Sequence, residues 1–201
     1  MTATPKLIKL GNQAYVDTYE KMRSLVKADL FDDEIWLLEH DAVFTLGTAA
    51  DPSHVLNPGD IPIVQTDRGG EVTFHGPGQL VIYFLLDIKK RKIGPKSLVS
   101  DLQTLIQNIL SRFSIESNCV DGAPGVYVEE KKIASIGLRI SKGRTYHGIS
   151  LNVNMDLEPF SRINPCGYEG LKVTQISDFD SNITLEGLES IATEEINKIF
   201  I

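Results

Sequence analysis

One cysteine stands in a setting that suits chemistry. Cys166 lies between a proline and a glycine, in a polar stretch after a short predicted helix at Leu157–Ile163. A structural cysteine usually lies buried in an apolar element, which is what we expect of Cys119 in the predicted strand Ser114–Val120. A loop cysteine is accessible enough to react. Cys166 is therefore a candidate nucleophile, although an unreactive surface thiol would also fit this position.

A nucleophilic thiol needs a cation or base beside it. At a pKa of about 8.5, only a few per cent of a thiol is ionised at neutral pH. The candidates for activating Cys166 are Lys132, His75 and His147. Lys132 opens an apolar stretch, so it either points to solvent or faces a dry pocket, where burial lowers its pKa and makes it a usable base.

The same side chains allow other chemistry. A Cys/His/Asp hydrolase arrangement fits the inventory of residues. A metal site built from Cys166, His75 and His147 is disfavoured, because neither a Cys-x-x-Cys nor a His-x-x-x-His spacing occurs, and we expect no metal.

A glycine-rich stretch, Arg68–Gln79, precedes the most apolar run of the chain, Leu80–Leu86. Glycines let backbone N–H groups approach a ligand, so this stretch could cradle a carbonyl or carboxylate; an ordinary wide turn is the alternative. It lacks the Gly-Lys-Ser/Thr end of a P-loop. Small residues also gather on two later strands, at Ala134, Ser135, Gly137, Gly148 and Ser150. They leave room for a slender ligand such as an acyl chain, although close packing of two strands would use them equally well.

Hydrophobic periodicity indicates how these residues are carried. Apolar residues at helical spacing predict helices over Gln13–Leu30, from Ser97 as N-cap to Phe113, and from Thr184 to the end. Short runs predict strands, of which Leu80–Asp87 is apolar on both faces and should be internal. The other predicted strands are Lys6–Leu10, Ile35–Glu39, Val43–Leu46, Ile63–Thr66, Ser114–Val120, Gly125–Glu129, Lys132–Ile140 and Thr145–Val153. Hairpin turns at Glu129–Lys132 and Lys142–Arg144 favour an α+β fold with a mixed, largely antiparallel sheet flanked by helices.

Composition sets the broad class of protein. The chain has 201 residues, 42% hydrophobic content and a net charge of −7. This length suits a single domain over residues 1–201. The negative charge disfavours nucleic acid as a partner, and no apolar run is long enough to predict a membrane span. Two cysteines do not form the framework of a small secreted protein, so we expect a cytoplasmic setting.

The chemistry-bearing stretches together resemble one family, the lipoyl(octanoyl) transferases. The resemblance runs from about Glu39 to about Gln175. It is carried by the segments Leu38–His40, Val43–Gly47, Asp67–Leu80, Gly125–Tyr127, Lys132–Gly137, His147–Gly148, Leu151–Val153 and Asn164–Gly167. The departure Asp41-Ala42, where the family often has two prolines, falls in a loop.

The resemblance implies a fold like the catalytic domain of the biotin/lipoate protein ligases. It implies a donor, octanoyl-acyl carrier protein, and acceptors, the lipoyl domains of 2-oxoacid dehydrogenase E2 subunits and the glycine-cleavage H protein. Cys166 would be the nucleophile and Lys132 its partner, with no cofactor. The acyl site would be lined by Arg68, Gly69, Gly70, Glu71, Val72, Thr73, Phe74, His75, Ser135, Ile136, Gly137, Gly148, Ile149 and Ser150. Backbone N–H groups near Cys166, or around Gly76–Gly78, would stabilise the oxyanion.

Three alternatives stay open from sequence. An ATP-dependent lipoate-protein ligase would need no cysteine, a non-catalytic medium-chain acyl-binding protein would never be acylated, and a cysteine hydrolase would release free acid. A basic cluster over Lys89–Lys96 is a further candidate, either as a docking site for an acidic carrier protein or as a solvated loop.

Overall fold

The computed structural model describes residues 4–167 and 169–201, and of Cys166 it describes the backbone only. The strands are β1 Lys6–Gln13, β2 Glu34–His40, β3 Val43–Leu46, β4 Ile63–Gln65, β5 Val72–His75, β6 Gln79–Leu85, β7 Asn118–Val120, β8 Ala123–Val128, β9 Lys131–Ser141 and β10 Arg144–Asn152. The helices are α1 Tyr15–Lys27, α2 Ile88–Arg91, α3 Pro95–Ser111 and α4 Leu185–Phe200. Short 3₁₀ turns are η1 Pro52–His54, η2 Glu158–Arg162, η3 Pro165–Gly167 and η4 Ile176–Asp178.

Within the described residues the strands form two sheets. The larger has the order β1-β2-β6-β10-β9-β8-β7, and the smaller has the order β4-β3-β5. Among these pairs β1 with β2 and β4 with β3 run parallel, and the others run antiparallel. The predicted α+β class with a mixed, largely antiparallel sheet is confirmed.

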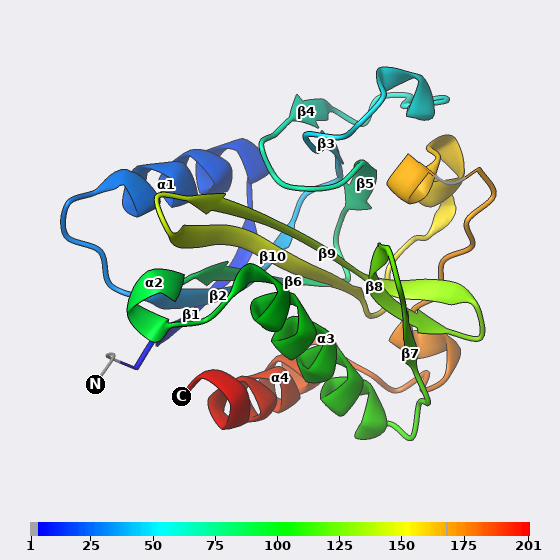
Figure 1. Cartoon of the computed structure of the whole chain (residues 1–201). Coiled ribbons are helices and arrows are strands. Elements are labelled where there is room, and N and C mark those ends of the chain that lie inside the picture. Colours follow the sequence, from blue (N-terminus) through cyan, green and yellow to red (C-terminus); the bar gives the residue numbers. More distant parts are fainter. Residues whose placement is uncertain (1–3, 168) are drawn as a thin grey trace.

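Two apolar layers hold the larger sheet between helices. In Figure 1, α3 and α4 lie on one face of this sheet, and α1 lies on the other. Strand β6 is buried along its whole length, as its two-sided apolar pattern predicted, because residues such as Phe84 pack toward α3 and α4 while Tyr83 packs toward α1. The smaller sheet lies beside the N-terminal end of α1 and has its own apolar cluster around Phe44 and Phe74.

The helix boundaries differ from the sequence prediction at two places. Helix α1 begins only at Tyr15, because β1 pairs with β2 as far as Gln13, and it ends at Lys27. Leu30, expected on the buried face, is therefore outside the helix and exposed. Helix α3 begins at Pro95 rather than after Ser97, since proline is well suited to the first helical turn.

The start of α4 follows the prediction. The Thr184 hydroxyl accepts a hydrogen bond from the Gly187 N–H at 3.2 Å, which caps the helix as expected of an N-terminal threonine.

The glycine-rich stretch Arg68–Gln79 contains a strand that the sequence did not predict. Residues Val72–His75 form β5 and pair with β3. Another difference concerns Cys119, which we expected to be buried. It lies on the edge strand β7 and is exposed, because β7 has a partner on one side only.

Candidate functional site

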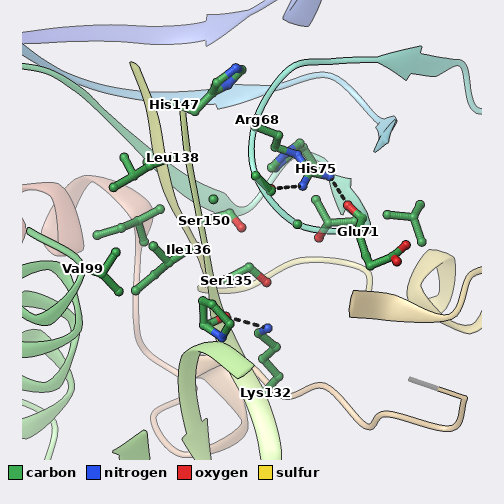
Figure 2. Close-up of a pocket in the computed structure, with 18 of the residues that line it drawn as sticks. Arg68, Glu71, His75, Val99, Lys132, Ser135, Ile136, Leu138, His147 and Ser150 are labelled. Carbon is green, nitrogen blue, oxygen red and sulfur yellow. Dashed lines mark hydrogen bonds between the residues drawn. The ribbon is translucent and has the colours of Figure 1, made fainter. Parts of the chain in front are cut away.

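A cavity of about 380 Å³ lies between the β9–β10 hairpin and the Arg68–His75 segment (Figure 2). Lys132 lines it, and so do all the predicted acyl-site residues except Phe74. Phe74 points the other way, against the rings of Phe44 and Phe160, because successive side chains of β5 alternate between faces. The structure thus brings together segments that are distant in sequence.

The cavity lies where the edge of β9 changes partners. Strand β8 pairs with β9 as far as Ser135, and further along the Gly69 N–H donates to the Leu138 carbonyl at 2.9 Å. Between these two partners the edge of β9 faces the cavity. Figure 2 shows Ile136 and Leu138 on one side of the hairpin, and Ser135 on the other side together with the Arg68–His75 segment.

Lys132 is a buried lysine whose side-chain nitrogen is held at the cavity. Its side chain is 3% exposed, and Nζ donates to the Pro124 carbonyl at 2.9 Å and lies 5.4 Å from the centre of the Tyr127 ring. Gly125 makes room for it: a Cβ there would lie 2.5 Å from Lys132 Cε. The open choice between a solvent-facing and a pocket-facing lysine is decided in favour of the pocket.

The side chain of Cys166 lies outside the described part of the structure, so its distance from Lys132 stays a prediction. The backbone nevertheless brings their segments together. The Lys132 N–H donates to the Lys172 carbonyl at 2.9 Å, and the Thr174 N–H donates to the Lys132 carbonyl at 3.0 Å. Six to eight residues after Cys166, the chain therefore runs beside Lys132.

The two histidine candidates are buried and uncharged at neutral pH. Burial, followed by the neighbouring His40, lowers the pKa of His75 to about 3. Burial also lowers the pKa of His147, against the opposing effect of the Asp67 carboxylate 3.3 Å from its Nε2. Neither histidine thus supplies the positive charge that would stabilise a thiolate, so Lys132 stays the predicted partner of Cys166.

Arg68 organises the glycine-rich segment. Its buried guanidinium donates to the carbonyls of Thr45, Gly69 and Glu71, at 2.6, 3.0 and 2.7 Å. The resulting fold is tight enough that a Cβ on Gly47 would lie 2.1 Å from the Gly70 carbonyl oxygen. Arg68 therefore positions the wall of the cavity.

One of the predicted oxyanion donors is directed elsewhere. The Gly78 N–H donates to the Glu39 carboxylate at 2.6 Å, and a Cβ on Gly78 would lie 2.1 Å from the Asn154 carbonyl oxygen. Donation from Gly76 or from the segment next to Cys166 stays a prediction.

Several lining residues were not predicted from sequence. They are Tyr15, Tyr83, Val99, Gly122, Ala123, Pro124, Leu138 and His147, the last proposed only as a base. Tyr15 stacks on His75 with ring centres 5.7 Å apart, although they come from the start of α1 and the end of β5. No local spacing links two residues of this kind, so only the fold reveals them.

The first part of the basic cluster, Lys89–Arg91, lies away from Lys132. The Lys89 side chain packs at Gly143, in the turn between β9 and β10, and Arg91 forms an ion pair with Asp33. From Lys132 to this turn β9 extends over about 30 Å at about 3.3 Å per residue. Lys96 lies instead in the first turn of α3, three residues before the cavity-lining Val99, so guidance of a carrier protein by the cluster stays a prediction.

The described residues contain no group of three or more His, Cys, Asp or Glu side chains placed to hold a metal ion. Nor does any helix among them combine the length and apolarity needed to cross a membrane.

Comparison with solved structures identifies the fold. Lipoate-protein ligase A bound with ATP superposes with a TM-score of 0.78 at 15% identity, over 98% of this chain and 85% of that chain. Biotin protein ligase from Aquifex aeolicus superposes with a TM-score of 0.56 at 15% identity, over 98% and 70%. The class of protein is therefore the catalytic fold that these ligases share, and the expected likeness is confirmed.

Sequence comparison narrows this class. The family model of the lipoyl protein ligase A/B catalytic domain matches residues 17–197. An octanoyltransferase of Marinobacter nauticus is 50% identical over 189 residues, which cover 93% of this chain and 89% of the relative. An octanoyltransferase of Legionella pneumophila strain Corby is 54% identical over 179 residues, covering 88% and 90%. The chain belongs to the lipoyl protein ligase A/B catalytic domain family, among relatives that are octanoyltransferases.

Proposed function

We propose that this protein moves an octanoyl group from octanoyl-acyl carrier protein to a lysine on lipoyl domains, through a thioester on Cys166. The acceptors would be 2-oxoacid dehydrogenase E2 subunits and the glycine-cleavage H protein. The observation that carries this proposal is the buried side-chain nitrogen of Lys132 at a cavity lined by the predicted acyl-site residues. The identity of about 50% to octanoyltransferases supports the reaction class.

The first half-reaction exchanges one thioester for another. The Cys166 thiol gives its proton to the neutral Lys132 amine, which makes a thiolate–ammonium pair. The thiolate then attacks the acyl carbonyl and forms a C–S bond to Cys166. The C–S bond to the carrier then breaks, and the released carrier thiolate takes the proton back from Lys132. A thioester is replaced by a thioester of similar energy, so the step needs no ATP.

The second half-reaction forms the amide. The acceptor amine attacks the Cys166 thioester, a C–N bond forms and the C–S bond breaks. Lys132 receives the proton that the amine loses and passes it to the departing Cys166 thiolate. An amide is more stable than a thioester, so transfer runs toward the modified acceptor. Splitting the transfer in this way gives ping-pong kinetics.

A decisive experiment is intact-mass spectrometry after incubation with octanoyl-acyl carrier protein. The wild-type chain should gain one octanoyl group, mapped to Cys166, and the Cys166→Ser variant should gain none as a thioester. Cys119→Ser is the matched control and should be acylated at the wild-type rate, because Cys119 lies on the exposed edge strand β7. An adduct on Cys119 alone would contradict the proposal.

Adding the acceptor separates this function from its alternatives. Release of free octanoate without an amide would indicate a cysteine hydrolase. Octanoyl-adenylate formed from free octanoate and ATP would indicate a ligase. Bound octanoate with no covalent adduct would indicate an acyl-binding protein.

A further inference from the structure

The segment that begins at η1 supports the loop carrying Cys166. The Asn164 N–H donates to the His54 carbonyl at 2.8 Å, and Val55 forms an isolated antiparallel bridge with Ile163. The chain on the N-terminal side of Cys166 is thus held at its backbone by residues that precede β4.

Two side chains complete this support. His54 Nδ1 lies 3.2 Å from a Glu71 carboxylate oxygen, and the same oxygen accepts the Asp51 N–H at 3.2 Å. Gly167, which follows Cys166, rests on the pair: a Cβ there would lie 3.3 Å from both His54 Cε1 and Glu71 Cγ. The residue next to the proposed nucleophile therefore packs directly against the His54–Glu71 pair.

Glu71 connects the His54–Glu71 pair to the cavity. It lines the cavity, and its carbonyl accepts a hydrogen bond from the Arg68 guanidinium at 2.7 Å. The side chains of His54 and Glu71 are 25% and 21% exposed, so the interaction between them is partly shielded from water. Movement of this pair would shift the Cys166 loop relative to the cavity wall.

We propose that His54 and Glu71 are positioning residues that hold the Cys166 loop against the Arg68–His75 segment for attack on the donor thioester. This inference rests on the proposed function, because it assigns the pair to acylation of Cys166. Neither residue is placed here among the groups that react. A displacement of about 1 Å between reacting groups can slow a reaction about 100-fold, so a support of this kind is worth testing through rates.

The test compares His54→Ala, which removes the interaction, with His54→Gln, whose amide can still donate to Glu71. Glu71→Ala removes the acceptor from the opposite side. Glu158→Gln is the control, because it breaks an exposed ion pair with Arg162 in the neighbouring η2 turn. Two quantities are measured for each protein: hydrogen exchange over residues 162–170, and the single-turnover rate of octanoylation of Cys166 from octanoyl-acyl carrier protein.

We expect His54→Ala and Glu71→Ala to speed exchange in 162–170 and to slow octanoylation roughly 10- to 100-fold. The carrier concentration that gives half the maximal single-turnover rate should stay near the wild-type value, and His54→Gln should recover most of the rate. Unchanged exchange would overturn the inference, and so would wild-type octanoylation despite faster exchange, or equal losses in the alanine and glutamine variants. If wild type forms no adduct while exchange still responds, the proposed function fails and the loop support stands.

Discussion

At the scale of the residue, Lys132 shows how burial changes the role that a lysine side chain can have. It opens a strand at a position where a lysine usually reaches solvent, yet its side chain is 3% exposed and its side-chain nitrogen bonds to the Pro124 carbonyl. Burying the polar nitrogen of a lysine costs free energy unless it is hydrogen-bonded, and the Pro124 carbonyl supplies such a bond. The position of this buried nitrogen at the cavity is the physical reason for the role proposed for Lys132.

Removing this side-chain nitrogen should abolish most of the activity. Lys132→Ala should lower kcat/KM by about 100-fold or more, the usual contribution of a proton-transferring group. Its neighbour provides the control, because Lys131 is only half-buried and does not line the cavity. Lys131→Ala should stay within about twofold of wild type. The measurement is octanoyl transfer to a lipoyl domain, and near-normal turnover of Lys132→Ala would show that another base is used.

At the scale of the element, the backbone of strand β8 leaves space for the Lys132 side chain. Gly125 has a φ of +145° and would, with a Cβ, lie 2.4 Å from the Ala134 carbonyl oxygen and 2.5 Å from Lys132 Cε. Only glycine combines this backbone conformation with the space that Lys132 needs. The β8 strand therefore places the proposed catalytic nitrogen as well as the cavity wall.

A methyl group on Gly125 should consequently displace Lys132. We expect Gly125→Ala to reduce octanoyl transfer more than tenfold and to lower the urea midpoint. Gly11→Ala is the matched control, because Gly11 also has a positive φ, +67°, but a Cβ there meets nothing within 4 Å. Gly11→Ala should carry only the backbone strain, with activity retained. Equal activity in the two variants would argue against a positioning role for Gly125.

The elements also show the limits of periodicity. The α4 cap at Thr184 and the two-sided burial of β6 follow from local patterns, and both were predicted correctly. Strand β5 was not predicted, because glycines surround it and its pairing partner β3 lies more than 20 residues away in sequence. Phe74 was assigned to the acyl site for the same reason: without the strand, its alternation away from the cavity is invisible.

At the scale of the whole molecule, buried histidines link stability to pH. His40 and His75 lie next to each other, with ring centres 5.9 Å apart, and His75 lines the cavity. Burial lowers the pKa of His40 to about 4 and that of His75 to about 3. In the unfolded chain both would titrate near a pKa of about 6.5, so below this pH the unfolded state binds protons that the folded state does not bind.

Stability should therefore fall as the pH drops from about 6.5 toward 4. Each histidine contributes a slope of about 1.4 kcal/mol per pH unit in this window, measured as the free energy of unfolding from urea titrations. His40→Asn should reduce the slope by about one histidine's share. The Asp67 carboxyl affects the free energy of unfolding only at lower pH. Burial would raise its pKa, but hydrogen bonds from His147, Tyr146 and Tyr19 outweigh burial and lower the pKa. A slope unchanged by the His40 substitution would contradict this account.

The amino-acid sequence by itself determined the family and the class of fold, and it supplied the residues of the proposed chemistry. The sequence states directly which residues carry a thiol or an amine and where the glycines stand. The pattern around Cys166, Lys132 and Arg68–His75 can therefore be recognised without knowledge of how the chain folds. Apolar periods of 2 and 3.6 residues likewise report which elements form, because they reflect local backbone geometry.

Only the tertiary structure decided which of these residues meet. It turned Lys132 inward, brought Lys172–Thr174 alongside it, and added Tyr15 and Tyr83 to the cavity. It also placed Lys89 of the basic cluster at the β9–β10 turn and exposed Cys119 on a sheet edge. These outcomes depend on strand order and register between segments far apart in sequence, and no local pattern specifies either one.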